Sequence, residues 1–365
     1  SLSYSTAAGL HSWLWATAII NGWPIKAALG CKRAHSARCG KTVKTGRACG
    51  GMTSGATHRK AVPTMTYSSD FLRRLETRGY IHQITDAAAL DGAAGKRAIT
   101  AYVGFDCTAP SLHIGNLVSI MMLRHLQASG HRPIVLMGGG TTKIGDPSGK
   151  DEARQLLGDE QINANLASIK RIFERFLTFG DGPTDAVMVN NDDWLSRLHL
   201  VPFLRDYGRH FSINRMLTFD SVRLRLEREQ PLSFIEFNYM IFQAYDYLEL
   251  NRRFGCTLQM GGSDQWGNIT AGIDLIRKTL SRQAHGITWP LVTRSDGSKF
   301  GKTADGAVWL DAERTSPYQF RQFWMQLSDA EIARYLPQFS LSTLEECAGI
   351  LAEHAAAPEK RVAQK

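Results

Sequence analysis

The feature that most constrains the fold is a strand–loop–helix–strand pattern that begins near residue 98. Residues 98–105 form an apolar run typical of a buried strand, and residues 106–111 are rich in turn formers. Apolar residues then recur at helical spacing over 117–126, Gly130 ends the predicted helix, and 133–137 form a second apolar strand. This is the length of a βαβ unit, which builds parallel sheets that bind ligands beyond the carboxyl ends of their strands.

The rest of the chain predicts further elements of the same fold class. Residues 151–254 read as helical, with apolar positions three and four apart in 162–176 and 234–250. Short strands are predicted at 256–260 and 290–293, and the chain reads as helical again from Pro317. We therefore expect an α/β fold: a Rossmann-like parallel sheet with a helical insertion, followed by a helical C-terminal region.

The net charge of +9 is confined to the start of the chain. Residues 1–64 hold nine Lys or Arg and no Asp or Glu, so the remainder has 43 − 9 = 34 basic residues against 34 acidic ones. The remainder thus carries no global signature of nucleic-acid binding. It has no apolar run of about 18 residues, which excludes a membrane-spanning helix.

The six cysteines have no paired metal spacing. We therefore predict no metal site in the protein, and a reducing compartment is favoured.

Residues 1–64 allow three interpretations. Their basic, acid-free composition is typical of a transit peptide, which would place the protein in mitochondria or plastids. The segment lacks any recognisable element, while Met65 opens a clean amphipathic stretch. We favour a translated upstream region with the natural start at Met65, and hence a cytoplasmic protein. An RNA-binding arm is the third interpretation.

Two loops carry residues suited to phosphate. The segment 108–116 lies between a strand and a helix start, where Thr108 and His113 could donate to phosphate oxygens. The segment 296–303 places Lys299 and Lys302 on either side of a glycine. Taken singly, a loop histidine or a lysine pair is more often a solvated surface feature.

The glycine spacing argues against a nucleotide-binding P-loop. Three residues separate Gly297 from Gly301, whereas the phosphate loop requires four. Residues 145–150 miss the same spacing, and their Asp-Pro pair is typical of a tight turn. A P-loop NTPase or kinase that uses Lys302 is therefore disfavoured.

Two further blocks carry polar side chains. Tyr239, Gln243 and Asp246 fall on one face of a predicted helix, where a buried Asp is costly unless it meets a partner. Residues 261–268 form a glycine-rich turn after a strand.

These blocks, in this order, resemble the tyrosyl-tRNA synthetases of the bacterial and organellar type. The resemblance runs from about residue 65 to 365 and also rests on the segment 102–106. Residues 113–116 resemble the HIGH signature and 299–303 the KMSKS signature of class I synthetases. Asn116 stands where the first signature ends in His, and Val103 stands where some members have Cys.

The resemblance implies a tyrosine site and an ATP site. The residues it assigns to tyrosine bind the phenol (Tyr102, Asp246), the ammonium (Asp146, Tyr239, Gln243) and the region of the carboxylate and α-phosphate (Gln265). The residues it assigns to catalysis grip the γ-phosphate (Thr108, His113) or close over the pyrophosphate (Lys150, Arg154, Lys299, Lys302). Those it assigns to ATP or the adenylate are Gly104, Asp106, Gly115, Asn116, Gly262, Asp264 and Thr303.

The implied reaction converts tyrosine and ATP into tyrosyl-adenylate and pyrophosphate, then transfers the tyrosyl group to the 3′ end of tRNA(Tyr). ATP is a substrate with Mg²⁺ expected, and no prosthetic group is implied. Alternatives are a tryptophanyl-tRNA synthetase and a non-catalytic RNA-binding derivative of the fold.

The resemblance also implies a domain order and a homodimer. The catalytic domain spans 65–288 with a helical insertion at about 190–254, through which members dimerise. Residues 289–316 form a linker that carries the lysine loop, and 317–365 begin a helical anticodon-side domain within which the chain ends.

Overall fold

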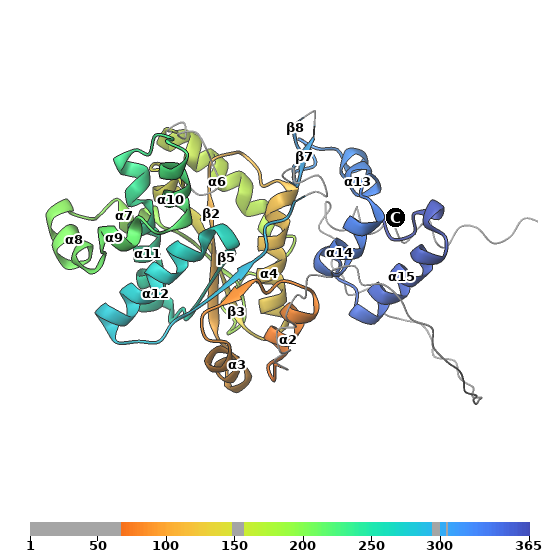
Figure 1. Cartoon of the computed structure of the whole chain (residues 1–365), viewed down its shortest axis with the longest axis horizontal. Helices are drawn as coiled ribbons and strands as arrows, with labels where there is room; N and C mark the ends of the chain where they lie inside the picture. Colours follow the sequence, from red (N-terminus) through yellow and green to blue (C-terminus); the bar gives the residue numbers. More distant parts are fainter. Residues whose placement is uncertain (1–66, 148–156, 294–299, 304–305) are drawn as a thin grey trace, which may run out of the picture. The chain divides into compact units, whose positions relative to one another are not determined.

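The centre of the protein is a six-stranded sheet with the strand order β1-β6-β5-β2-β3-β4 in the computed structural model (Figure 1). The neighbouring strands pair in parallel, except that β1 runs antiparallel to β6. The strands are β1 (Gln83–Ile84), β2 (Thr100–Asp106), β3 (Arg132–Gly138), β4 (Val187–Asn190), β5 (Leu258–Gly262) and β6 (His285–Trp289). The predicted α/β fold with a Rossmann-like parallel sheet is confirmed.

The structure describes residues 67–147, 157–293, 300–303 and 306–365. Lys150, Arg154 and Lys299 lie outside these residues, as does the whole segment 1–64. Lys302 and Thr303 are described by their backbone only. Within the described ranges, no helix is long and apolar enough to cross a membrane.

Helices cover both faces of the sheet. Alternate strand residues point to opposite sides, and apolar residues on both sides are buried by these helices. Ala101, Val103 and Phe105 of β2 pack into the core that contains α2 (Asp70–Thr77) and α4 (Leu117–Ala128). Tyr102 points to the other face, into the core formed with α11 (Phe234–Phe254) and α12 (Trp266–Leu280). Figure 1 shows α11 and α12 on one side of the sheet and α4 on the other.

The long helix α11 has strong local signals at both ends. Ser233 and Glu236 form a capping box, in which each side chain accepts from the other residue's backbone N–H. Gly255 ends the helix at φ 62°, a left-handed conformation that glycine adopts without steric cost. These signals fix where the helix begins and ends.

The remaining elements complete the described part of the chain. Between β2 and α4 lies the 3-10 turn η2 (Ile114–Asn116), and between β5 and α12 lies η4 (Ser263–Gln265). The helices before α11 are α3 (Ala87–Lys96), α5 (Gly139–Thr142), α6 (Asp159–Phe173), α7 (Asp192–Leu195), α8 (Leu200–Asp206), η3 (Gly208–His210), α9 (Ile213–Met216) and α10 (Asp220–Glu227). After the sheet come the hairpin β7 (Lys302–Thr303) and β8 (Gly306–Ala307), then α13 (Pro317–Met325), α14 (Asp329–Phe339), α15 (Leu344–Ala356) and η5 (Pro358–Lys360).

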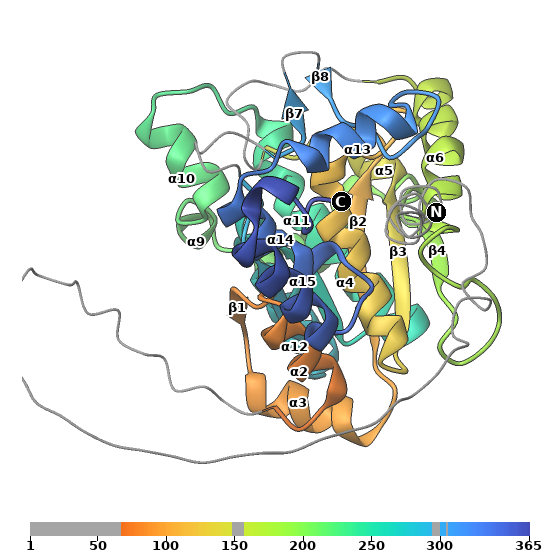
Figure 2. The same cartoon turned by 90° about the vertical axis from the view of Figure 1, so that its right-hand side faces the viewer.

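The C-terminal helices confirm the predicted helical region, and α14 packs against α4 (Figure 2). The guanidinium of Arg78 donates to the carbonyls of Pro337 and Ser342. The hydroxyl of Tyr80 donates to the carbonyl of Gln338. The end of α14 is therefore tied to the turn that follows α2.

Two sequence predictions about strands were wrong. Residues 187–190 fall in the segment that was predicted to be helical, yet they form strand β4 beside β3. β4 has only four residues, all partly buried, so it shows no alternation of apolar and polar positions. The strand predicted at 290–293 lies earlier, at His285–Trp289. The sequence pattern missed it because two of its buried residues, His285 and Thr288, are polar.

Candidate active site

A cavity of about 420 Å³ opens at the carboxyl ends of β2 and β5. These strands are neighbours in the sheet, but the chain visits β3 and β4 between them. The connections from β2 and β5 therefore leave in opposite directions, which is the point where open α/β sheets bind ligands. Helix α11, the carboxyl end of β3 and the segments that follow β3, β4 and β6 supply further walls.

The carboxylate of Asp246 is buried at this cavity and is held by two donors. The amide of Asn191 donates to its Oδ2 at 2.9 Å, and the indole N–H of Trp194 donates to its Oδ1 at 2.7 Å. Burial raises the pKa of Asp246 to about 7, although these two hydrogen bonds act to lower it. The orientation of this carboxylate is thus fixed by residues that directly follow β4.

Tyr102 lines the same cavity, and the residue is only 1% exposed. Its hydroxyl is buried without a hydrogen-bond partner in the structure. Burial, together with the nearby charge of Asp246, raises the pKa of Tyr102, so the phenol stays protonated. A buried hydroxyl without a partner is costly, and a polar ligand in the cavity would remove that cost.

A second group of polar side chains lies at the end of β5. Gln265 donates to the carboxylate of Asp146 at 3.1 Å and accepts from Gln243 at 3.2 Å. Asn268 donates to the amide oxygens of Gln243 and Gln265. The four side chains, from three separate segments, form one hydrogen-bonded network.

Asp106 at the end of β2 links the two sides of the cavity. The hydroxyl of Tyr239 donates to it at 3.2 Å, and that of Thr141 at 2.9 Å. Asn191 in turn donates to the Thr141 hydroxyl. Asp106 and Asp246 are therefore joined through two intervening side chains.

His113 caps the turn η2 with its own ring. The ring Nδ1 of His113 accepts from the backbone N–H of Gly115 at 3.0 Å. The backbone N–H of His113 donates to the side-chain amide oxygen of Asn116 at 3.1 Å. Because Nδ1 is the acceptor, the neutral ring carries its proton on Nε2. His113 can thus act as a hydrogen-bond donor at the cavity, and Asn116 helps to hold it there.

The segment after the lysine pair contacts the His113 segment directly. Val308 accepts from the N–H of Ile114 at 2.8 Å and donates to the carbonyl of Gly301 at 2.9 Å. Gly301 has φ +86°, and a Cβ added to it would lie 2.4 Å from Cγ2 of Ile114. Only glycine fits here, so the two signature segments lie backbone against backbone.

Comparison with known proteins identifies the family of this chain. The family model for class I tRNA synthetases (W and Y) matches residues 94–365. The tyrosine–tRNA ligase of Caulobacter sp. (strain K31) is 61% identical over 283 residues, which cover 78% of this chain and 68% of the relative. That of Zymomonas mobilis subsp. mobilis is 63% identical over 286 residues, covering 78% and 70%. This chain belongs to the tyrosyl-tRNA synthetase family.

Solved structures support the same assignment. A C-terminally truncated mitochondrial tyrosyl-tRNA synthetase from Aspergillus nidulans superposes with a TM-score of 0.71 at 32% identity, covering 80% of this chain and 86% of that one. A tryptophanyl-tRNA synthetase from Encephalitozoon cuniculi shares the fold, with a TM-score of 0.55 at 14% identity over 79% and 78% of the two chains. The expected resemblance to class I synthetases, which use ATP as a substrate, is confirmed.

Most of the residues that the sequence assigned to the synthetase site line this cavity at the ends of β2 and β5. The residues brought together there are Tyr102, Gly104, Asp106, Thr108, His113, Gly115, Asn116, Asp146, Tyr239, Gln243, Asp246, Gly262, Asp264 and Gln265. The other assigned residues are Lys150, Arg154 and Lys299, which lie outside the described residues, and Lys302 and Thr303, whose side chains are not described. Their roles stay predictions.

Sequence reasoning missed several side chains at the cavity or directly behind it. Asn191 and Trp194 hold Asp246, and Trp309 lines the cavity with its ring edge-on to His113, at 6.4 Å between ring centres. Recognition of β4 as a strand would have indicated the first two, because its carboxyl end lies at the same edge of the sheet. Trp309 had no comparable signal.

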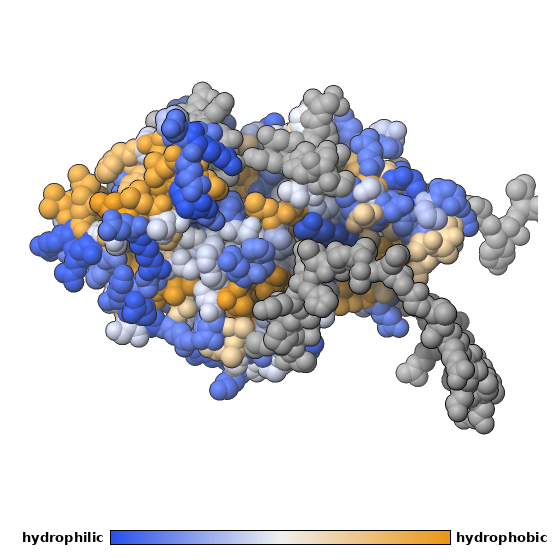
Figure 3. Space-filling model, in the orientation of Figure 1, coloured by the Kyte–Doolittle hydropathy of each residue, from blue (hydrophilic) through white to orange (hydrophobic). Residues whose placement is uncertain are grey.

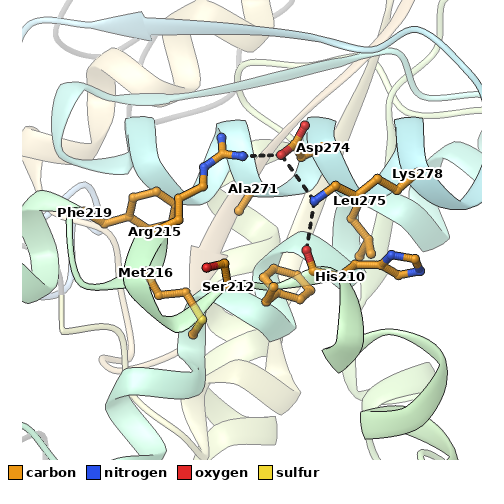
Figure 4. Close-up of a pocket in the computed structure, with 10 residues that line it drawn as sticks. His210, Ser212, Arg215, Met216, Phe219, Ala271, Asp274, Leu275 and Lys278 are labelled. Carbon is orange, nitrogen blue, oxygen red and sulfur yellow. Dashed lines mark hydrogen bonds and ion pairs between the residues drawn. The ribbon is translucent and has the colours of Figure 1, made fainter.

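A second, smaller hollow of about 50 Å³ lies between α9 and α12 (Figure 4). Asp274 pairs there with Arg215 and Lys278, and Lys278 donates to the carbonyl of His210. Its size and its satisfied charges make it a structural junction between the inserted helices and α12.

Proposed function

We propose that the chain activates tyrosine with ATP, forming tyrosyl-adenylate and pyrophosphate, and transfers the tyrosyl group to the 3′ end of tRNA(Tyr). One observation carries the choice of tyrosine: the partnerless buried hydroxyl of Tyr102 lies beside the buried carboxylate of Asp246. A phenol O–H can donate to that carboxylate and accept from Tyr102. An indole or a phenyl ring cannot make both bonds.

The rest of the tyrosine would lie along the polar network. Asp146, Tyr239 and Gln243 supply oxygen atoms for its ammonium group, and Gln265 lies near them for the carboxylate. The carboxylate of tyrosine is already ionised at neutral pH, because α-carboxyl groups titrate at about 3.5. No general base is needed for its attack on the α-phosphate of ATP.

The barrier to this attack lies in bringing two anions together and in spreading charge onto the leaving pyrophosphate. Donors and cations that are fixed before the reaction lower such a barrier. Thr108 and the Nε2–H of His113 would serve the γ-phosphate. Lys150, Arg154, Lys299 and Lys302 would serve the pyrophosphate, with Thr303 beside them.

The remaining lining would hold the nucleotide. Asp106, Gly262 and Asp264 lie at the carboxyl ends of β2 and β5, where the ribose or the amino acid would bind. Gly104, Gly115 and Asn116 offer close backbone approach. Mg²⁺ would be carried mainly by the ATP phosphates, since Mg²⁺ commonly binds substrate phosphates and one or two carboxylates. Within the described residues, no cluster of three or more His, Cys, Asp or Glu could hold a metal by itself.

Trapping of the intermediate tests this proposal. The full chain is incubated with labelled tyrosine, MgATP and pyrophosphatase, then passed through a desalting column. We expect label to elute with the protein in near-equimolar amount, and to move to tRNA(Tyr) when that is added. No protein-bound label with tyrosine, or equal label with tryptophan, would contradict the proposal.

We also propose that the protein is a homodimer that associates through the helical insertion. Among the described residues, nine of the eleven exposed large apolar side chains lie between 200 and 235. They gather over the α8–α10 end of the molecule (Figure 3). Monomeric proteins rarely expose so concentrated an apolar surface. The nine are Leu200, Val201, Leu204, Ile213, Leu217, Leu224, Leu226, Phe234 and Ile235.

Light scattering with a matched pair of variants tests the dimer. Phe234 is 83% exposed within this surface, and Tyr318 is 70% exposed outside it. We expect a dimer for the unaltered chain and for Tyr318→Asp, and a monomer for Phe234→Asp. A monomeric unaltered chain, or a dimeric Phe234→Asp variant, would contradict the proposal.

We propose the domain order and the compartment as the sequence predicts them. The catalytic domain would span 65–288 with its insertion at about 190–254, and the linker 289–316 would lead into the anticodon-side helices. A cytoplasmic protein is favoured, with an organelle as the alternative if residues 1–64 act as a transit peptide. Cell fractionation of the natural protein distinguishes the two.

A further inference from the structure

The chain on either side of residues 294–299 is held by the C-terminal helices. The hydroxyl of Tyr335 in α14 donates to the carbonyl of Thr293, the last described residue before this segment. The N–H of Phe300, the first described residue after it, donates to the carbonyl of Val292 at 3.4 Å. The two flanks are therefore fixed next to each other.

Phe300 is buried in a group of aromatic rings that we call the aromatic anchor. Its members from α13 and α14 surround the Phe300 ring at centre-to-centre distances of 4.8–6.1 Å. The ring of Tyr335 is the nearest at 4.8 Å, and Phe300 is 3% exposed. The aromatic anchor consists of Phe300, Phe323, Trp324, Tyr335 and Phe339.

The base of this anchor is itself fixed to the catalytic domain. Arg78 and Tyr80 donate to backbone carbonyls at the end of α14, and Gln338 donates back to the carbonyl of Gly79 at 3.1 Å. Tyr335 lies within one turn of these contacts. Its hydroxyl therefore reaches Thr293 from a supported helix.

The residue after Phe300 contacts the first signature segment. Gly301 accepts from Val308, whose carbonyl accepts from Ile114 next to His113. One short stretch of chain thus touches the aromatic anchor through Phe300 and the His113 segment through Gly301. Lys299 and Lys302 flank this stretch in the sequence.

We propose that Tyr335 and Phe300 are positioning residues for the activation step, which set where the backbone of residues 300–302 lies relative to His113. This rests on the function proposed above. The two residues act through the backbone they hold and do not touch the substrates. The C-terminal helices would thereby contribute to ATP chemistry as well as to tRNA binding.

Substitution of Tyr335 by Phe tests the hydroxyl alone, because the ring stays in the aromatic anchor. We expect tyrosine-dependent ATP–pyrophosphate exchange to lose about 2- to 10-fold in kcat/KM for ATP, the effect of one neutral hydrogen bond. The dissociation constant of tyrosine, measured by equilibrium dialysis, should stay within about twofold, since Tyr335 does not line the tyrosine site.

Tyr247→Phe is the matched control. The hydroxyl of Tyr247 is also buried and also donates to a backbone carbonyl, that of His285 at 2.9 Å. This control removes the same kind of bond outside the aromatic anchor, and we expect it to lower thermal stability without changing kcat/KM for ATP. An equal change in both variants would mean that Tyr335 is merely structural and would overturn the proposal.

Phe300→Leu provides a second test that keeps an apolar side chain in place. We expect it to lower kcat/KM for ATP in the same direction as Tyr335→Phe, again with tyrosine binding retained. Unchanged ATP kinetics in both variants would overturn the positioning role while exchange by the unaltered chain stands. Absence of exchange in the unaltered chain would instead overturn the proposed function itself.

Discussion

The indole nitrogen of Trp194 donates to Oδ1 of Asp246 at 2.7 Å, and both side chains are almost fully buried. Asp246 lies on α11, whereas Trp194 follows the edge strand β4, so the bond joins the two walls of the cavity. A carboxylate held in this way presents its remaining acceptor capacity in one direction. It is therefore preorganised for a ligand donor such as a phenol.

Replacement of Trp194 by Phe should weaken tyrosine binding. The variant removes one donor to a charged group, and we expect an increase of about 3- to 10-fold in the dissociation constant. The Michaelis constant for ATP should change little. Equilibrium dialysis measures the first quantity, and Trp324→Phe, which alters an indole remote from the cavity, serves as the control. Equal effects of the two substitutions on tyrosine binding would argue against a role for the Trp194–Asp246 bond.

Replacement of Tyr102 by Phe should reduce discrimination between tyrosine and phenylalanine. In the unaltered protein, phenylalanine leaves the buried Tyr102 hydroxyl without a partner, and the variant removes that cost. We expect the ratio of kcat/KM values for the two amino acids to fall by about 10-fold. The ratio is read from exchange kinetics with each amino acid, and an unchanged ratio would exclude Tyr102 as a partner of the phenol.

The raised pKa of Asp246 predicts a pH dependence of stability. An unfolded Asp titrates near 3.8, whereas burial raises the pKa of Asp246 to about 7 in the folded protein. Between these values the folded state holds a proton that the unfolded state has released, so this group's contribution to stability is lost as pH rises from 4 to 7. Asp246→Asn should remove that dependence.

Urea unfolding at pH 5 and pH 8 measures this effect. We expect the free energy of unfolding to fall more between these pH values in the unaltered protein than in Asp246→Asn, by about 2–4 kcal/mol. The comparison of the two proteins cancels the titration of all other groups. An identical change in both would show that Asp246 titrates in its ordinary range.

Two substitutions of His113 separate its two contacts. His113→Asn keeps an oxygen that can accept from the N–H of Gly115, whereas His113→Ala loses both the cap and the ring donor. If the Nε2–H serves the departing pyrophosphate, both variants should lower kcat for exchange by about 100-fold while tyrosine affinity is retained. Recovery of activity in His113→Asn would instead assign the loss to the cap.

The sequence predicted the fold and much of the site because the relevant signals were local. A buried strand, a polar loop and an amphipathic helix at 98–126 lie within one short stretch. The spacing of Tyr239, Gln243 and Asp246 places them on one face of α11 whatever the rest of the chain does. The structure brings all three to the cavity.

The parts that were missed depend on contacts between distant segments. β4 was predicted to be helical because its four half-buried residues show no alternation of apolar and polar positions. Asn191 and Trp194, the partners of Asp246 that follow β4, were therefore missed as well. The pairing of Val308 with Ile114 joins segments that are more than 190 residues apart. No local sequence pattern in either segment predicts its contact with the other. The signature match grouped them by family resemblance, and the physical contact came from the structure.

Amino-acid-dependent ATP–pyrophosphate exchange by the full chain decides whether this cavity activates tyrosine. We predict exchange that requires tyrosine, with tryptophan and phenylalanine giving little, and that is lost in His113→Ala. Exchange stimulated by tryptophan and not tyrosine, or steady release of phosphate from ATP without any amino acid, would contradict the account.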